Sequence, residues 1–261
     1  MRPEWKISPP AAWQTIRLDR VDSTSSFLKR NAADLPDRLA VRADAQTEGR
    51  GRMGRSWSSP RGGLYMSLLL RPAPPPEIAA LVPLLMAHLL GIRFWDATGV
   101  PALVKWPNDC LVPDGKLAGI LAEYGGRKTP WLVVGMGVNL DAAPEKADDR
   151  PIPPSAWSDY GAPPPAGDLF EGMLADLDGL WPLRGVNPLP GVRRSIERRL
   201  WSRGREVAAD RGSDIVRGVV EGLDDLGHLR VYGPTGTTVL SSGEIRPTGL
   251  EEPKMILEGG N

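Results

Sequence analysis

Cysteine and histidine are nearly missing from this sequence. Among 261 residues there are one cysteine and two histidines, Cys110, His88 and His228. A single cysteine cannot form an internal disulfide, so we expect a reducing compartment, the cytoplasm. The scarcity of both residue types also excludes a Cys/His zinc cluster and argues against a histidine-based catalytic triad.

The chain also lacks an excess of charge, because 32 acidic residues balance 32 basic ones. Any positive surface must be local, and we expect no general affinity for nucleic acid. The opening MRPEWKISPP has no apolar run typical of a secretory signal. The most hydrophobic stretch, Ile78 to Ile92, contains Pro83 and is shorter than the roughly 20 residues of a membrane span. We therefore expect a buried helix and no membrane partner.

Two familiar catalytic motifs are absent, the Walker-type phosphate loop and the His-Glu-x-x-His metal motif. What is present is GRGRMGR at 49–55, whose glycines fit the G-x-G-x-x-G spacing of dinucleotide-binding turns. The RSWSSPRGG that follows cannot begin a helix, and RPAPPP at 71–76 contains no acidic residue. The dinucleotide interpretation therefore fails.

This Gly/Arg loop (residues 49–55) has a different physical use. Glycine amides and the forked guanidinium groups of Arg50, Arg52 and Arg55 suit a phosphate or a carboxylate. The alternative is a solvated basic turn, partly neutralised by Glu48.

A second polar group is KWPNDCLVPDGK, at 105–116. Pro107 of this segment stiffens the turn that carries Asn108 and Asp109. A carboxylate beside lysines is typical of a site for magnesium-complexed phosphate, with Asp109 as the candidate ligand. The alternative is a turn in which both side chains bond their own backbone. Activation of a carboxylate with ATP needs no nucleophile, since positioning and charge stabilisation suffice.

Hydrophobic patterning predicts an α/β (α+β) domain over residues 1–203 and a compact β module over 204–261. In the first part we expect strands at Leu39–Ala43, Leu64–Leu70 and Trp131–Leu140, a helix over Glu77–Asp96, a pairing of Leu103–Trp106 with Lys116–Glu123, a long connection over 141–167, and helices over Asp168–Trp181 and Val192–Trp201.

Five segments resemble, in order and spacing, the motifs of biotin protein ligases. They are DSTSS (22–26), QTEGRGRMGRSW (46–57), KWPNDC (105–110), GKLAGILAE (115–123) and GMGVNL (135–140). The resemblance implies a mixed-sheet, class II synthetase-like catalytic domain of the biotin/lipoate ligase type, followed by a small SH3-like β-barrel. It also implies synthesis of biotinyl-5′-AMP from biotin and ATP with Mg²⁺, then transfer of biotin to a lysine of a carboxylase's biotin carboxyl carrier domain.

The same resemblance assigns roles to individual residues. Biotin-binding residues would be Ser23, Thr24, Gln46, Gly49, Arg50, Lys116, Gly119 and Gly135. ATP-binding residues would be Arg52, Arg55, Trp57, Asn108, Asp109, Lys116 and Asn139, with Trp157 covering the adenine. Lys116, bridging the biotin carboxylate and the α-phosphate, would act in catalysis with Arg52 and Asp109.

Some positions depart from the family pattern. Ser25 stands where relatives often carry asparagine, so one ring contact would be lost or made through water, and Glu48 replaces a smaller residue. Only 21 residues precede Asp22, too few for the DNA-binding domain of some relatives, so we expect no operator binding. The resemblance allows a homodimer. A lipoate ligase and a non-catalytic biotin or nucleotide sensor remain as alternatives.

Overall fold

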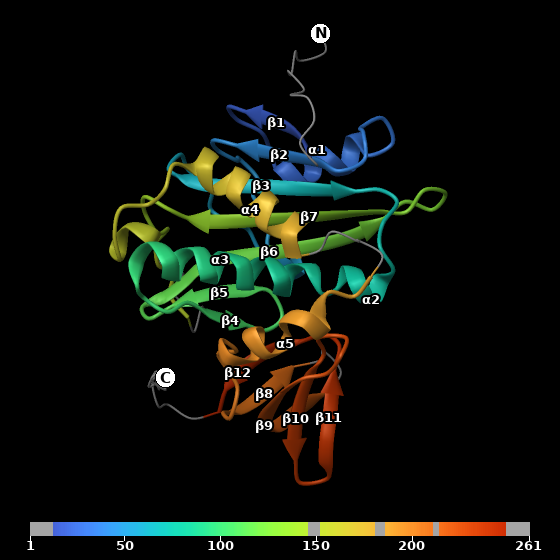
Figure 1. The fold of residues 1–261 in the computed structure, drawn as a ribbon, viewed down its shortest axis with the longest axis vertical. Coiled ribbons are helices and arrows are strands. Elements are labelled where there is room, and N and C mark those ends of the chain that lie inside the picture. The colour runs from blue at the N-terminus through green and yellow to red at the C-terminus, as the bar shows by residue number, and fades with distance from the viewer. Residues whose placement is uncertain (1–12, 146–151, 181–185, 211–213, 249–261) are drawn as a thin grey trace.

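The structure, a computed structural model, describes residues 13–145, 152–180, 186–210 and 214–248. Its larger part is built on a seven-stranded sheet with the order β1-β2-β3-β7-β6-β5-β4, in which β1 and β2 are parallel and the other pairs antiparallel. The strands are β1 (Gln14–Leu18), β2 (Leu39–Ala43), β3 (Gly63–Leu70), β4 (Leu103–Lys105), β5 (Asp109–Val112), β6 (Gly115–Gly125) and β7 (Trp131–Asn139). The mixed sheet and its helices confirm the expected α/β class (Figure 1).

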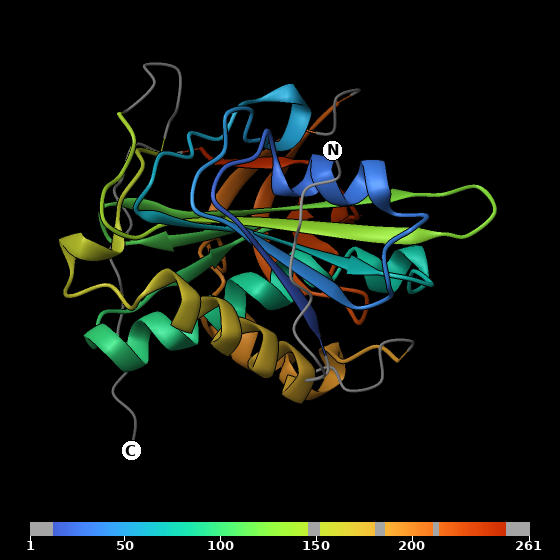
Figure 2. The same cartoon turned by 90° about the horizontal axis from the view of Figure 1, so that it is seen from above.

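Helices cover both faces of this sheet. On one face α1 (Thr24–Asn31) packs against β3 and β7, and on the other lie α3 (Val82–Thr98) and α4 (Ala166–Leu180), as Figure 2 shows. Helix α1 starts after Ser23, whose hydroxyl accepts a hydrogen bond from the Ser26 amide at 3.3 Å, an N-cap. The cap matters because it places Ser23 and Thr24 at the start of a helix that lies on the sheet.

The helix expected over Glu77–Asp96 is divided in two. A single turn, α2 (Pro76–Ala79), is followed by α3, in which Pro83 occupies the first turn, where its missing N–H costs nothing. The span Pro76–Thr98 is long and apolar enough to cross a membrane by length and composition, but 78% of its most apolar window is buried inside the protein. It is the core helix of this fold.

The predicted pairing of Leu103–Trp106 with Lys116–Glu123 is wrong. Strand β4 pairs with β5, and β5 pairs with β6, so an additional strand lies between the two segments. The Trp106-Pro107 peptide is cis, and this tight turn folds Asp109 back opposite Lys105. The Pro113-Asp114-Gly115 turn therefore joins β5 to β6, and at the other end of β5 Asp109 lies between Lys105 of β4 and Gly119 of β6.

The other expected elements of the first part are observed with small shifts. The strand over Trp131–Leu140 is β7, and the two late helices are α4 and α5 (Leu189–Arg198), each beginning a few residues earlier than expected. The long connection contains a short 3₁₀ turn, η2 (Trp157–Asp159), as the Gly/Arg loop contains η1 (Arg52–Gly54). Its segment 146–151 lies outside the described residues.

The C-terminal module (residues 206–247) is a five-stranded antiparallel sheet. Its order is β11-β10-β9-β8-β12, with β8 (Glu206–Asp210), β9 (Ile215–Leu223), β10 (Leu229–Gly233), β11 (Gly236–Leu240) and β12 (Glu244–Pro247). Within the part of the chain that the structure describes, no pairing joins β11 to β12. The compact β module expected here is thus confirmed as an antiparallel sheet, whereas the pairings do not close it into the SH3-like barrel that the resemblance implies.

One turn of this module docks on the larger part. The Trp106 indole donates to the Gly227 carbonyl at 3.0 Å, and a Cβ at Gly227 would lie 2.4 Å from a methyl carbon of Leu81. Gly227 also has a φ of 75°, which glycine adopts without strain. We propose the domain boundary at residues 203 and 204, since the seven-stranded sheet ends at β7 and β8 begins at Glu206.

Candidate functional site

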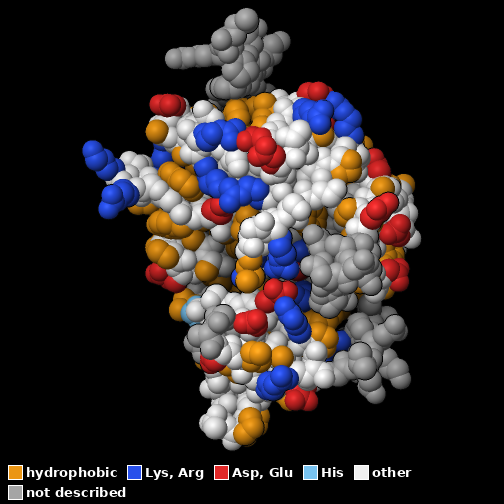
Figure 3. Space-filling view, turned by 180° about the vertical axis from the view of Figure 1, so that it is seen from behind, with side chains coloured by type: hydrophobic (Ala, Val, Ile, Leu, Met, Phe, Trp, Pro, Cys, Tyr) orange, Lys and Arg blue, Asp and Glu red, His pale blue; other side chains and the backbone are white. Residues whose placement is uncertain are grey.

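A cavity opens on the face of the large sheet that carries α1. It is lined by the start of α1, the Gly/Arg loop, the β4–β5 turn, strands β6 and β7, and Glu244 of the C-terminal module. Thirteen of the fifteen residues assigned from the sequence line it, namely Ser23, Thr24, Gln46, Arg50, Arg52, Arg55, Trp57, Asn108, Asp109, Lys116, Gly119, Gly135 and Asn139. Lysine and arginine side chains gather in the middle of this face, although the protein has no net charge (Figure 3).

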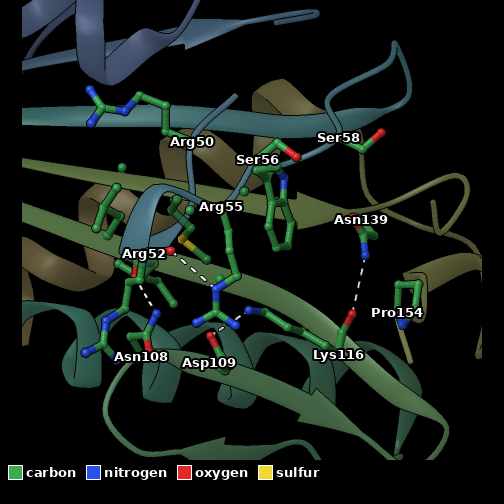
Figure 4. Close-up of a pocket in the computed structure, with 18 of the residues that line it drawn as sticks. Arg50, Arg52, Arg55, Ser56, Ser58, Asn108, Asp109, Lys116, Asn139 and Pro154 are labelled. Carbon is green, nitrogen blue, oxygen red and sulfur yellow. Dashed lines mark hydrogen bonds and ion pairs between the residues drawn. The ribbon is translucent and has the colours of Figure 1, made fainter. Parts of the chain in front are cut away.

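Cations from two distant segments meet in this cavity. Lys116 Nζ lies 2.8 Å from Asp109 Oδ1, an ion pair rather than an aligned hydrogen bond, and Arg52 Nη1 donates to Asn108 Oδ1 at 3.1 Å (Figure 4). Burial lowers the pKa of Arg52, an effect that the Asp109 carboxylate opposes. Because a guanidinium stays charged in proteins, both side chains can stabilise an anion held between them.

The remaining arginines of the Gly/Arg loop are held by carboxylates. Arg50 points away from Arg52 and Lys116 and lies 3.4 Å from Glu123, while Arg55 lies 3.3 Å from Glu244 (Figure 4). Arg52 also donates to the Gly243 carbonyl at 3.3 Å. The loop is thus tied to β6 on one side and to the C-terminal module on the other.

A chain of hydroxyl and amide groups forms the other end of the cavity. Gln46 Oε1 accepts hydrogen bonds from the Thr24 amide at 2.8 Å and from Thr24 Oγ1 at 3.1 Å. The single hydroxyl proton of Thr24 is used in the second bond, so Thr24 Oγ1 can only accept from other groups. Ser67 must then donate to Thr24, at 2.7 Å, and Ser25 must donate to Ser67, at 2.9 Å. Beyond the amide, Gln46 Nε2 donates to Ser59 Oγ at 2.8 Å.

The direction of this hydroxyl chain (Ser25, Ser67, Thr24, Gln46, Ser59) decides what it can bind. Both lone pairs of Ser25 and the second N–H of Gln46 remain for a ligand, and the Ser23 hydroxyl proton has no acceptor among the described residues. A neutral group that contains both donors and acceptors, such as a cyclic urea, is complementary to this set. A charged group is not.

Trp57 lies across the floor of the cavity between these two ends. A Cβ at Gly137 would be 2.3 Å from the indole Nε1 and one at Gly119 would be 3.1 Å from the ring, and these two glycines are register partners in β7 and β6. Lys116 Nζ lies 5.3 Å from the centre of the ring, within cation–π distance. A larger residue at either position would therefore collide with the Trp57 indole, which rests on these two glycines.

Two asparagines fix the segments around the cations. Asn108 donates to the Ile120 carbonyl at 2.8 Å, which holds the β4–β5 turn on β6. Asn139 donates to the Ser155 carbonyl at 2.9 Å and to the Lys116 carbonyl at 3.3 Å, which joins the end of β7 to the long connection and to β6. Both side chains thus hold backbone in place as well as line the cavity.

The structure places two sequence-assigned residues elsewhere. Trp157 is 1% exposed and packs edge-on against Phe94, with ring centres 4.9 Å apart, in the core beneath the opposite face. It therefore does not cover an adenine in this structure. Gly49 does not line the cavity. Its backbone packs against the Trp57 carbonyl, whose oxygen would lie 2.2 Å from a Cβ at this position.

Several lining or supporting residues had no role assigned from the sequence, and Ser67, Lys105 and Glu244 are the most informative of them. Ser67 is the polar residue in the otherwise apolar β3, which was its only signal. Lys105 begins the KWPNDC motif, but the resemblance assigns it no role, and Glu244 of the C-terminal module also lines the cavity. Glu244 is far from the other site residues in the sequence, so no local pattern could have indicated it.

Two family models match this chain, one in its larger part and one in its C-terminal module. A model of the biotin/lipoate A/B protein ligase family matches residues 18–139, and one of the biotin protein ligase C-terminal domain matches residues 204–246. Among solved structures, the biotin protein ligase from Aquifex aeolicus in complex with biotin and ATP is similar, with a TM-score of 0.77 and 26% identity over 90% of this chain and 99% of that one.

Curated relatives agree over nearly the whole chain. A biotin–[acetyl-CoA-carboxylase] ligase of Paracoccus denitrificans is 32% identical over 87% of this chain and 98% of its own length. One of Mycobacterium tuberculosis is 34% identical over 92% of this chain and 91% of its own. The bifunctional ligase/repressor BirA of Bacillus subtilis is 36% identical over 41% of its length. This chain belongs to the biotin protein ligase family and is a ligase.

Proposed function

We propose that the protein activates biotin with ATP to form biotinyl-5′-AMP and transfers biotin to a lysine of a carboxylase's biotin carboxyl carrier domain. The observation that carries this proposal is the polarity of the cavity. One end presents uncharged hydroxyl and amide groups, and the other presents Lys116 and Arg52. Biotin has the same polarity, with a cyclic urea at one end and a carboxylate at the other.

In the first step a biotin carboxylate oxygen attacks the α-phosphorus of ATP. A bond from this oxygen to phosphorus forms while the bond from phosphorus to the pyrophosphate oxygen breaks, and the electron pair leaves with pyrophosphate. Both reactants are anions, so they repel one another until cations lie between them. We assign this role to Lys116 and Arg52, since charge that is already in place stabilises the transition state without reorganisation.

The other nucleotide-side residues support these two. Trp57 keeps the Lys116 amine over its ring, Asn108 orients Arg52, and Asn139 fixes the backbone of Lys116. Arg55 would contact the nucleotide after leaving Glu244. On the biotin side we propose Ser23, Thr24, Gln46 and Gly135 as the ring contacts, with Gly119 and Arg50 at the rim.

Magnesium fits this site only as an ion that ATP brings with it. Within the described ranges there is no group of three His, Cys, Asp or Glu side chains that could hold a metal. Mg²⁺ is usually held by substrate phosphates with one or two carboxylates, and Asp109 is the carboxylate beside the cations. When bound, the ion would neutralise phosphate charge.

In the second step the acceptor lysine attacks the carbonyl carbon of the mixed anhydride. A C–N bond forms, the bond to the AMP oxygen breaks, and one proton is released. Water would compete for the same carbon, so the Gly/Arg loop must shield the intermediate until the acceptor arrives. Its ties to Glu123 and Glu244 hold it over the cavity. The cytoplasmic location and a homodimer stay predictions.

The function is tested by biotin-dependent exchange of labelled pyrophosphate into ATP, with lipoate as the comparison substrate. We expect exchange with biotin and none with lipoate, because the hydroxyl chain is complementary to a polar ring rather than to an aliphatic tail. Exchange with lipoate alone would favour a lipoate ligase. No exchange with either substrate, while biotin still binds, would favour a sensor.

A change at Ser67 tests the hydroxyl chain itself. In Ser67→Ala, Thr24 loses its donor and Ser25 its acceptor, so we expect the Kd of biotin to rise about tenfold while the KM of ATP stays within twofold. Isothermal titration calorimetry measures the first and the exchange assay the second. Ser202→Ala is the matched control, because Ser202 is also fully buried but its hydroxyl has no hydrogen-bond partner in the described part of the chain. Unchanged biotin affinity in Ser67→Ala would remove the chain from the biotin site.

A further inference from the structure

Lys105 is a cation of the cavity whose amine has no partner. Its side chain lines the cavity and is only 9% exposed. Lys116, Arg50 and Arg55 each have a carboxylate within 4 Å, and Arg52 has two hydrogen-bond acceptors. Across the residues that the structure describes, the Lys105 amine makes neither an ion pair nor a hydrogen bond.

An unpaired lysine in such a place is costly unless something compensates it. Lysine is almost never fully buried without a partner, because removing its charge from water is unfavourable. Burial lowers the pKa of Lys105, Asp109 and Glu244 act in the opposite direction, and Lys116 and Arg52 add to the lowering. The opposing effects of two carboxylates and two cations leave the charge of the amine without a net counter-charge from these groups.

The direction of the side chain excludes a purely structural role in the core. Along β4, Val104 is fully buried in the hydrophobic core, where α3 also packs. Since neighbouring residues of a strand point to opposite faces, Lys105 points to the face that carries the cavity. Its amine is therefore available to a ligand rather than to the core.

The order of the strands shows which part of a ligand it would meet. From the hydroxyl chain to Lys105 the sheet runs β3 with Ser67, β7 with Gly135, β6 with Lys116, β5 with Asp109, and β4 with Lys105. Lys105 is the register partner of Asp109, and Asp109 is that of Gly119, so β4 lies two strand spacings, about 10 Å, beyond β6 on the side away from the hydroxyl chain. In an in-line displacement the leaving group departs opposite the attacking oxygen.

We propose that Lys105 binds the β- and γ-phosphates of ATP and the pyrophosphate that leaves. The inference rests on the proposed function: if biotin approaches from β3 and β7 and its carboxylate meets the α-phosphate at Lys116, pyrophosphate must point toward β4. Lys105 then supplies the positive charge where negative charge develops on the leaving group. Lys116 and Arg52 remain with the reacting α-phosphate.

The test uses inorganic pyrophosphate and ATP as probes on Lys105→Met, which keeps the length of the side chain and removes its charge. We expect the Kd of pyrophosphate and the KM of ATP to rise about tenfold or more, the scale of one charge-assisted hydrogen bond, with the Kd of biotin unchanged within twofold. Lys105→Arg should recover most of the loss. Lys29→Met is the control, because Lys29 pairs with Glu123 at 2.6 Å and does not line the cavity.

The outcomes separate this proposal from the function on which it rests. Removing an unpaired buried charge should leave the melting temperature of Lys105→Met equal to or above that of the wild type, so loss of affinity through unfolding is recognisable. Unchanged pyrophosphate affinity in the folded variant, or an equal loss of biotin affinity, overturns the assignment of Lys105. If the wild type shows no biotin-dependent pyrophosphate exchange but Lys105→Met still loses pyrophosphate binding, the proposed function is overturned. The assignment of Lys105 to an anion-binding subsite is then retained.

Discussion

Lys116→Ala is expected to lower biotin-dependent pyrophosphate exchange at least about 100-fold, close to 3 kcal/mol of the activation barrier, the scale seen when one preorganised charge or donor is removed. In the proposed function Lys116 lies where the biotin carboxylate meets the α-phosphate, so its loss removes a positive charge from between the two anions. The fold should survive, because this side chain makes an ion pair and a cation–π contact rather than core packing.

The control for this variant is Lys29→Ala. Its amine is in an ion pair at 2.6 Å and its side chain is 21% exposed, close to the 28% of Lys116, but it lies outside the cavity lining. It should retain exchange within about twofold, since a partly exposed ion pair contributes little. Single-turnover formation of biotinyl-5′-AMP separates the chemical step from binding. Near-normal turnover in Lys116→Ala would refute the role given to this lysine.

His88→Leu is expected to remove a large part of the acid sensitivity of the protein. His88 is 2% exposed in α3, its Nδ1 has no hydrogen-bond partner among the described residues, and burial lowers its pKa to about 4, helped by Arg199 and Arg198. The unfolded chain takes up a proton near pH 6.5, whereas the folded chain does so only near pH 4. The unfolding free energy is therefore highest above pH 6.5 and falls as the pH drops toward 4.

The difference between 6.5 and about 4 corresponds to about 3 kcal/mol of unfolding free energy. Urea titrations at pH 7 and pH 4 measure it. The wild type should lose about 3 kcal/mol more than His88→Leu between the two values, and at pH 7 the variant should be as stable as the wild type or more so. Parallel pH profiles for the two proteins would mean that folding does not change the pKa of His88, contrary to its burial.

Local patterns predicted most of the elements, and the failures have a common cause. Strand β2 has the predicted bounds, and β3 and β7 differ by one residue, because runs of apolar residues bounded by turn formers need no information from elsewhere. The pairing of β4 failed because two apolar runs separated by one strong turn indicate a hairpin, whereas a second, cis-proline turn adds a strand between them. Partner choice among strands is a property of the whole sheet.

The site shows the same limit at the level of side chains. The resemblance assigned Trp157 to the adenine, but the residue is buried against Phe94, where a short 3₁₀ turn carries it into the core. Conversely, Ser67 and Glu244 belong to no motif around the cavity, and only the folding of β3 beside α1 and of β12 beside the Gly/Arg loop brings them there. Contacts between segments distant in sequence leave no local trace.

By itself the sequence determined the family, the class of fold and the chemistry available, since glycines, arginines and a lysine at fixed spacings need no tertiary information to be recognised. Only the tertiary structure decided how that chemistry is ordered in space. The succession of strands places Ser67 of the hydroxyl chain on β3, Lys116 on β6 and Lys105 on β4, in that order across one face of the sheet. The reason is physical, because the energy of a buried charge depends on which neighbours share its low-dielectric surroundings, and those neighbours come from segments far apart along the chain.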